Sequence, residues 1–196
     1  MFALAAAGCS GARGGAEGGA RPEVVLHDAA EYRYYAVEGS DASSIRESLD
    51  RGAQQLEGRR GWGATHWDIR WRAQWASTGP LCRVTEVDVQ LRIEVVLPRW
   101  EPSRGAGEGL ARDWQALVAA LSRHEAGHVD IASAAARAVR AAISRVTART
   151  CDGMDARTRA EGERVVRDYT EQQRLYDERT ELGAAQGVAW PPRPSR

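Results

Sequence analysis

Hydrophobic and polar residues alternate along two long segments in the first half of the chain. Apolar side chains occupy every second position from Trp67 to Trp75, and again from Val87 to Leu97. A period of two predicts β-strands that bury one face. Residues 77–80 between them read Ser-Thr-Gly-Pro, which is typical of a turn. We therefore predict a long antiparallel hairpin.

Shorter patterns precede the hairpin. Residues 31–38 are rich in Tyr and Val, which favours another strand. Ile45 and Leu49 lie four residues apart, shortly after Ser40 and Asp41, which predicts a short capped helix. We expect the three strands to form an antiparallel meander.

The pattern becomes helical after Leu110. Apolar residues then recur at every third or fourth position, which predicts a helix to about residue 147. Cys151-Asp152-Gly153 predicts a turn, and a second helix is expected from residue 155 to about 180. The predicted fold class is therefore α+β: an antiparallel β meander with one short helix, followed by a long antiparallel helical hairpin.

The first 22 residues indicate an export signal and a tether. A small apolar run ends in Ala6-Ala7-Gly8-Cys9, which resembles the end of a truncated bacterial lipoprotein signal with Cys9 as the lipidated residue. Residues 10–22 are rich in Gly and Ala, as in a flexible tether. The alternative is a tail with an incidental cysteine. We assign residues 23–187 to a single domain and residues 188–196 to an irregular, Pro-rich tail.

Export would place the protein in the periplasm or cell envelope as a lipoprotein, with membrane contact only through the anchor. The two remaining cysteines, Cys82 and Cys151, would then favour one disulfide. Two buried free thiols are the alternative. The 27 acidic and 27 basic residues leave no basic excess, so we expect no nucleic-acid partner.

The sequence His124-Glu125-Ala126-Gly127-His128 carries the clearest chemical signal. On a helix the two histidines project from one face, one turn apart, and their imidazole nitrogens can bind one Zn2+ ion. Glu125 can then accept a proton from the attacking water, as the general base of a metallopeptidase that hydrolyses a peptide or protein substrate. The alternative is a pair of surface histidines on an amphipathic helix.

A zinc site of this kind needs a third protein ligand, and no histidine follows His128. If the second helix returns antiparallel from a turn near position 152, the residues opposite the histidines lie near positions 176 and 180. The carboxylates at that height are Asp177, Glu178 and Glu181. We predict Asp177 as the third metal ligand, with Glu181 as the alternative. The competing explanation for this cluster is a solvated charged face.

The predicted β-hairpin also has a consequence for substrate binding. It would offer a strand edge with which an extended peptide can pair. Trp67, Trp71 and Trp75 share one face of the first strand. They either line such a groove together with Arg72 or pack against the helices.

Several short motifs occur in a defined order along the chain. They are Tyr35-x-Val-x-Gly39, Thr65-x-Trp-x-Ile-x-Trp71, Cys82-Arg-Val84, Leu97-Pro98-x-Trp100, His124-Glu-x-Gly-His-Val-Asp-Ile131 and Tyr176-Asp-x-x-Thr180. Together they resemble the bacterial domain-of-unknown-function 922 family, described as predicted secreted zinc-dependent proteases. The resemblance implies an exported zinc-dependent hydrolase, with His124 and His128 as ligands and Glu125 as the base. It also implies that Cys82 and Cys151 stand at the family's cysteine positions.

One position departs from the family pattern. The last motif continues in the family to a histidine, the natural third ligand, whereas this chain has Leu182 there. A neighbouring carboxylate could replace the histidine, or the site could bind metal weakly or be inactive. The alternative function is therefore a catalytically degenerate cell-envelope binding module on the same fold.

Overall fold

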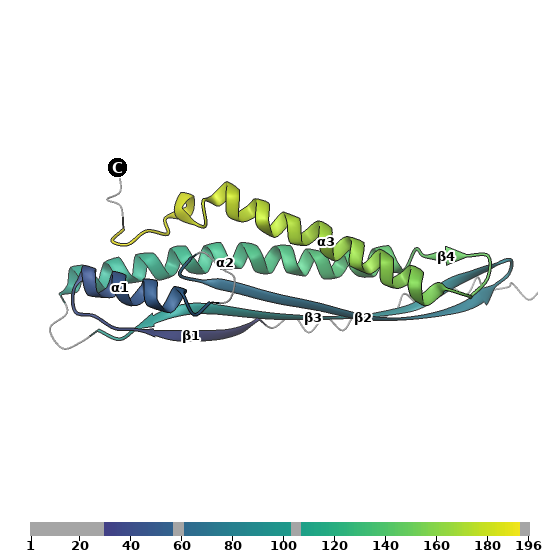
Figure 1. The fold of residues 1–196 in the computed structure, drawn as a ribbon, viewed down its shortest axis with the longest axis horizontal. Helices are drawn as coiled ribbons and strands as arrows, with labels where there is room; N and C mark the ends of the chain where they lie inside the picture. Colours follow the sequence, from purple (N-terminus) through teal and green to yellow (C-terminus); the bar gives the residue numbers. More distant parts are fainter. Residues whose placement is uncertain (1–29, 57–60, 103–106, 193–196) are drawn as a thin grey trace, which may run out of the picture.

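The computed structural model describes residues 30–56, 61–102 and 107–192, which form a sheet and two long helices. The elements in chain order are β1 (Glu31–Val37), α1 (Ala42–Ala53), β2 (Ala64–Thr78), β3 (Leu81–Trp100), α2 (Glu108–Ile143), β4 (Thr147–Ala148), α3 (Met154–Thr180) and the 3-10 helix η1 (Ala184–Gln186). Figure 1 shows an elongated molecule in which α2 and α3 run along the β2–β3 hairpin. The predicted α+β fold class is confirmed. The predicted signal, lipidated Cys9 and tether lie outside the described residues.

The sheet differs from the expected meander in the placement of β1. Strands β2 and β3 pair antiparallel with Trp71 opposite Val89, as predicted. The strand order is β1-β3-β2, and β1 runs parallel to β3 rather than antiparallel to its neighbour. The long connection through α1 carries the chain past β3 before β2 begins. Strand β1 therefore joins the edge of β3 that β2 leaves free.

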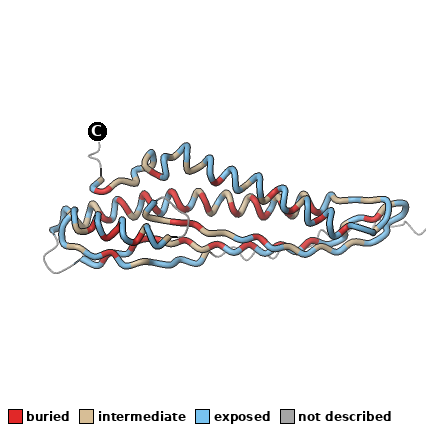
Figure 2. Tube along the Cα trace, viewed as in Figure 1, coloured by how far each residue is buried: buried red, intermediate tan, exposed pale blue. Residues whose placement is uncertain are grey.

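The core lies between the hairpin and α2. The apolar face of β3 is buried, and so is the facing side of α2. These buried side chains are Val87, Val89, Leu91, Ile93, Val95 and Leu97 of β3, and Leu117, Leu121, Ala132, Ala135, Val139 and Ile143 of α2. Figure 2 shows the buried residues gathered where α2 faces the strands. The small alanines let α2 lie close to the sheet over several turns.

The segment after η1 returns to the core although it has no regular secondary structure. Trp190 is only 4% exposed and packs edge-on against Trp114, which also contacts Trp100. The Trp190 indole N–H donates to the backbone oxygen of Ala42 at 2.8 Å. Trp190 therefore ties the segment after η1 to the start of α1. Within the described residues, no helix is long and apolar enough to cross a membrane.

The predicted disulfide is confirmed between Cys82 and Cys151. It joins the first residues of β3 to the turn before α3, across a sequence separation of 69 residues. Strand β4 pairs with β3 at the same place, with Ala148 opposite Cys82. The crosslink therefore fastens the base of the helical hairpin to the sheet.

Removing this crosslink is expected to destabilise the fold. The double variant Cys82→Ala/Cys151→Ala should lose about 2–4 kcal/mol of unfolding free energy, because the unfolded chain regains the entropy of a long loop. Urea denaturation followed by circular dichroism measures the loss. Wild-type protein treated with dithiothreitol is the matched control and should show a loss of the same size. A loss below about 0.5 kcal/mol in both samples would show that the crosslink contributes little.

Candidate metal centre

His124 and His128 lie one turn apart on the side of α2 that faces α3. The two residues are 5% and 3% exposed, so the alternative of two surface histidines is wrong. The ring centroids are 4.9 Å apart and the rings are nearly perpendicular. Helical spacing put both rings on one side of α2, and packing against α3 buries them.

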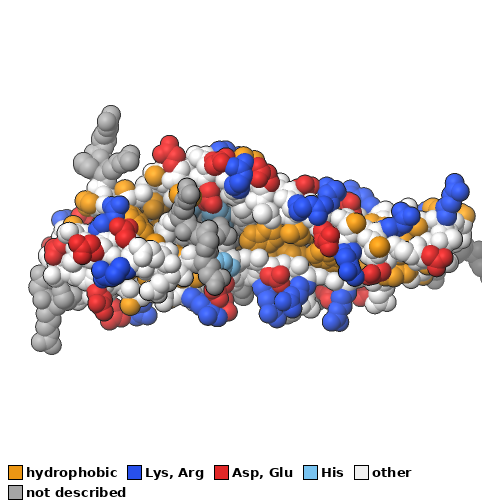
Figure 3. Space-filling model, in the orientation of Figure 1, with side chains coloured by type: hydrophobic (Ala, Val, Ile, Leu, Met, Phe, Trp, Pro, Cys, Tyr) orange, Lys and Arg blue, Asp and Glu red, His pale blue; other side chains and the backbone are white. Residues whose placement is uncertain are grey.

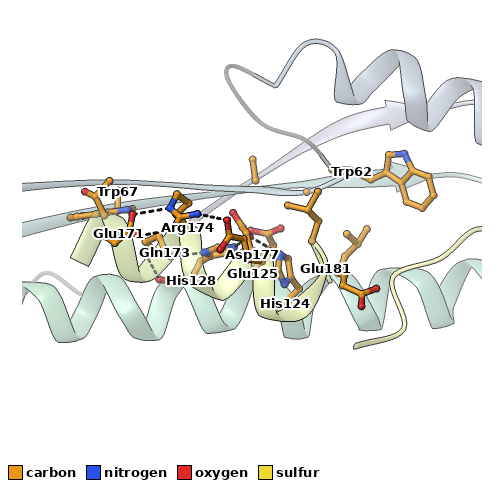
Figure 4. A pocket seen from close by; sticks show the side chains of 17 residues that line it. Trp62, Trp67, His124, Glu125, His128, Glu171, Gln173, Arg174, Asp177 and Glu181 are labelled. Carbon is orange, nitrogen blue, oxygen red and sulfur yellow. Dashed lines mark hydrogen bonds and ion pairs between the residues drawn. The ribbon is translucent and has the colours of Figure 1, made fainter. Parts of the chain in front are cut away.

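Asp177 of α3 faces both imidazoles. Its Oδ1 atom lies 2.8 Å from Nε2 of His128 and 3.4 Å from Nε2 of His124. The ligand atoms of His124, His128 and Asp177 all lie within 4.8 Å of one another, so this group could hold a metal ion. Figure 4 shows the three side chains converging between α2 and α3.

The other predicted candidate, Glu181, does not join this group. It follows the last residue of α3 with a positive φ of 51°, and its side chain is exposed. Leu182 also has a positive φ, and its backbone N–H donates to the backbone carbonyl oxygen of Asp177 at 2.8 Å. The helix ends one turn after Asp177, so Glu181 leaves the face of α3 that packs on α2. The structure brings Asp177 to the histidines; that these residues bind metal stays a prediction.

Two glutamines determine which imidazole nitrogen is available. Nδ1 of His128 contacts Oε1 of Gln173, and Nδ1 of His124 lies 3.0 Å from Oε1 of Gln186. The Gln173 amide orientation is set because its Nε2 donates to the His128 backbone oxygen at 3.0 Å. An amide oxygen only accepts, so each Nδ1 carries a proton and donates it. The Nε2 atoms that face Asp177 are then left to bind a cation.

Tyr176 supports the first histidine. Its ring stacks on His124 at a centroid distance of 5.2 Å, and its hydroxyl donates to the His124 backbone oxygen at 3.1 Å. A side chain at Gly127 would overlap the Tyr176 hydroxyl, so a glycine in the motif lets the ring lie against α2. The hydroxyl also accepts from Nε2 of Gln186 at 3.1 Å, which orients that amide oxygen toward His124.

A reversal after α3 places Gln186 in this network. Gly183 has a φ of 86°, and a side chain there would meet His124 and Val188. The chain turns back at this glycine, and η1 returns to α2. Without this turn, Gln186 would lie beyond the end of α3, away from the histidines.

Glu125 points from α2 toward the start of β2. Its Oε2 accepts a hydrogen bond of 2.6 Å from the Thr65 hydroxyl, and the residue is 3% exposed. It lines the same cavity as His124, His128 and Asp177. The bond to Thr65 holds one carboxylate oxygen and leaves the other available to accept a proton.

The group formed by His124, His128 and Asp177, here called the triad, favours a positive charge between its side chains. Burial raises the pKa of Asp177, but its hydrogen bonds to His124 and His128 outweigh burial and hold this pKa well below its usual value. Burial lowers the pKa of His124, but its hydrogen bonds with Asp177 and Gln186 outweigh burial and raise this pKa above its usual value. Asp177 and His124 therefore stabilise a cation between Oδ1 and Nε2, either a proton or a metal ion.

The triad opens onto a cavity of about 800 Å³ between β2 and α3. Trp62, Trp67 and Leu121 supply apolar lining, and Glu171, Arg174 and Glu178 lie on the α3 side. Two imidazole nitrogens and one carboxylate oxygen, with an open side, match the donor set of a catalytic zinc site. The residues present therefore fit the predicted Zn2+ ion.

Comparison with known proteins assigns the chain to a family. Residues 32–184 match the model of the bacterial protein family of unknown function DUF922. The chain belongs to the DUF922 family. This result confirms the resemblance found in the sequence. No curated protein and no solved structure matches this DUF922 chain.

Sequence reasoning missed the residues that orient the metal-centre side chains in this DUF922 protein. Thr65 and Tyr176 stood in the quoted motifs, but nothing in their spacing indicated contact with Glu125 or His124. Gln173 lies four residues before Asp177 on α3, so helical spacing alone could have marked it as a neighbour of the site. Gln186 carried no signal, because only the turn at Gly183 brings it to α2.

Proposed function

We propose that this protein is an exported zinc-dependent metallopeptidase. The observation that carries the proposal is the convergence of His124, His128 and Asp177 at an open cavity, with the carboxylate of Glu125 on the same wall. Bound zinc would supply a Lewis acid and a water activated at neutral pH. The substrate would be a peptide or protein.

The chain's own residues have separate roles in this proposal. Glu125 takes the proton of the attacking water at its free oxygen and passes it to the leaving amine. Thr65 holds the other oxygen of Glu125, which fixes the direction of the carboxylate. Gln173 and Gln186 keep the imidazoles in the tautomer that presents Nε2 to the metal.

Three observations support an exported location. The family is bacterial, and the Cys82–Cys151 disulfide suits an oxidising compartment such as the periplasm. The sequence before the described residues contains the lipoprotein-like run that ends at Cys9. We therefore propose a cell-envelope location, with a lipid at Cys9 as the membrane anchor.

Metal removal tests the proposal. The purified protein should bind one equivalent of zinc and cleave reduced, carboxymethylated insulin B chain. Dialysis against a chelator should abolish cleavage, because the triad is left without its Lewis acid, and one equivalent of zinc should restore it. Mass spectrometry of the products measures cleavage, and circular dichroism checks that the metal-free protein stays folded. Undiminished cleavage by metal-free protein would contradict the proposal.

The second candidate function is a binding module with a degenerate site. Leu182 favours it, because this side chain lines the metal cavity and is 41% exposed where the family pattern has a histidine. A module would bind zinc stoichiometrically and hydrolyse none of a broad set of unfolded proteins. The peptidase would do both, so zinc content and product analysis on the same sample separate the two functions.

A further inference from the structure

The metal cavity continues into a groove between β2 and α3. A second hollow of about 470 Å³ shares Trp67 and Thr170 with the metal cavity. A third, of about 660 Å³, shares Trp71 with the second and extends to Trp75. The three hollows therefore lie in a row along β2 and α3, each sharing lining residues with the next, and together we call them the groove. Figure 3 shows an uncovered apolar stripe in this part of the surface, leading away from histidine side chains.

One wall of the groove is the outer edge of β2. In residues 30–56, 61–102 and 107–192, β2 pairs with β3 alone, so its other edge has no strand partner. Unpaired strand edges present backbone donors and acceptors that pair with an extended polypeptide. Both tryptophan alternatives from the sequence hold in part, because Trp67 and Trp71 pack on the core and still line the groove.

The opposite wall is α3. A Cβ at Gly162 would lie 2.5 Å from the Trp71 indole, so this indole packs against the α3 backbone between the second and third hollows. The charged side chains along the groove have both signs: Asp68, Asp155 and Glu163 against Arg70, Arg72, Arg159 and Arg167. Mixed charges do not select a polyanion or a polycation. The groove would therefore recognise its ligand through backbone hydrogen bonds with β2 and through apolar contacts.

We propose that the groove binds the substrate as an extended polypeptide that pairs with the free edge of β2. The inference rests on the proposed function and adds that the substrate is extended and lies along β2. The stretch from Trp67 to Trp75 spans about 26 Å at 3.3 Å per residue. Substrate residues on one side of the cleaved bond therefore occupy the groove, up to about eight of them.

A blocked groove tests the proposal separately from catalysis. Thr170 is an exposed α3 residue where the metal cavity meets the second hollow. Thr170→Arg fills this junction with a long side chain. Gln172→Arg adds the same side chain at an exposed α3 position that lines none of these hollows, and it is the matched control. Both changes are made in zinc-loaded Glu125→Gln protein, which should hold the substrate without cutting it.

Fluorescence anisotropy with labelled, carboxymethylated insulin B chain measures binding. Thr170→Arg should weaken binding at least tenfold, and Gln172→Arg should change it less than twofold. Both variants should keep one zinc per chain. Shortening the peptide from one of its two ends should weaken binding step by step. The affinity should stop changing once about eight residues have been removed from that end.

Other outcomes overturn the proposal in distinguishable ways. Equal affinity of the two arginine variants would show that the peptide binds elsewhere. A stable dimer in sedimentation that only Thr170→Arg dissociates would show that a second copy of this chain occupies the edge. If wild-type protein binds the peptide in the groove without hydrolysing it, the peptidase function is wrong and the proposed binding groove stands. If hydrolysis depends on neither peptide length nor Thr170, the peptidase function stands and the proposed binding groove is wrong.

Discussion

Replacing Asp177 with Ala is expected to lower zinc affinity at least about a hundredfold, because it removes the carboxylate that faces both imidazole Nε2 atoms. Glu181→Ala is the matched control, since Glu181 was the other predicted ligand and its side chain is exposed. The structure predicts a change of less than about threefold for the control. Competition with a fluorescent zinc chelator measures both affinities.

This pair of variants decides the third ligand. The reverse result, with weak zinc binding in Glu181→Ala alone, would show that α3 rearranges when metal binds. Equal affinity in both variants and wild type would show that the two histidines bind zinc without a carboxylate from α3. Asp177→Ala should stay folded, because the changed side chain lies at the cavity and not in the apolar core.

Replacing Glu125 with Gln is expected to reduce peptide hydrolysis by about 10²–10⁴-fold and to leave zinc content unchanged. A glutamine has nearly the same shape, and its amide oxygen can still accept the 2.6 Å hydrogen bond from Thr65. It cannot accept the proton of the attacking water at neutral pH. The loss should therefore fall on kcat, while KM changes little.

The control for this variant is Thr65→Val, which removes the hydroxyl that holds Glu125 and keeps the carboxylate. Its activity should lie between wild type and Glu125→Gln, because the base is present but less well oriented. Single-turnover assays with zinc-loaded protein measure the rates. Activity of Glu125→Gln within a fewfold of wild type would show that Glu125 is not the general base.

The orientation of the two histidine rings in the candidate metal centre is set by neighbouring side chains. Gln173 and Gln186 set the tautomers, and Tyr176 packs on His124. These side chains come from α3 and from the segment after it, whereas both histidines belong to α2. α3 and the segment after it therefore supply both Asp177, the proposed third ligand, and the side chains that orient the two histidines.

Several features of the fold follow from local patterns and could be predicted. Alternation along β2 and β3 gave the hairpin, because a strand with one buried face needs apolar residues at every second position. The histidine spacing put both rings on one side of α2 for the same kind of reason. Reflecting α2 onto α3 limited the third ligand to a few carboxylates, since both helices rise by 1.5 Å per residue.

By itself, the sequence determined the strands, the long helices, the family and the residues of the histidine motif, because these depend on periodicity and spacing along the chain. Only the tertiary structure decided that β1 lies parallel to β3 and that Asp177 rather than Glu181 faces the histidines. It also placed Gln186 on His124 and, within the described parts of the chain, gave β2 a strand partner on one edge only. These outcomes depend on where helices end and how distant elements pack, and no local pattern carries that information.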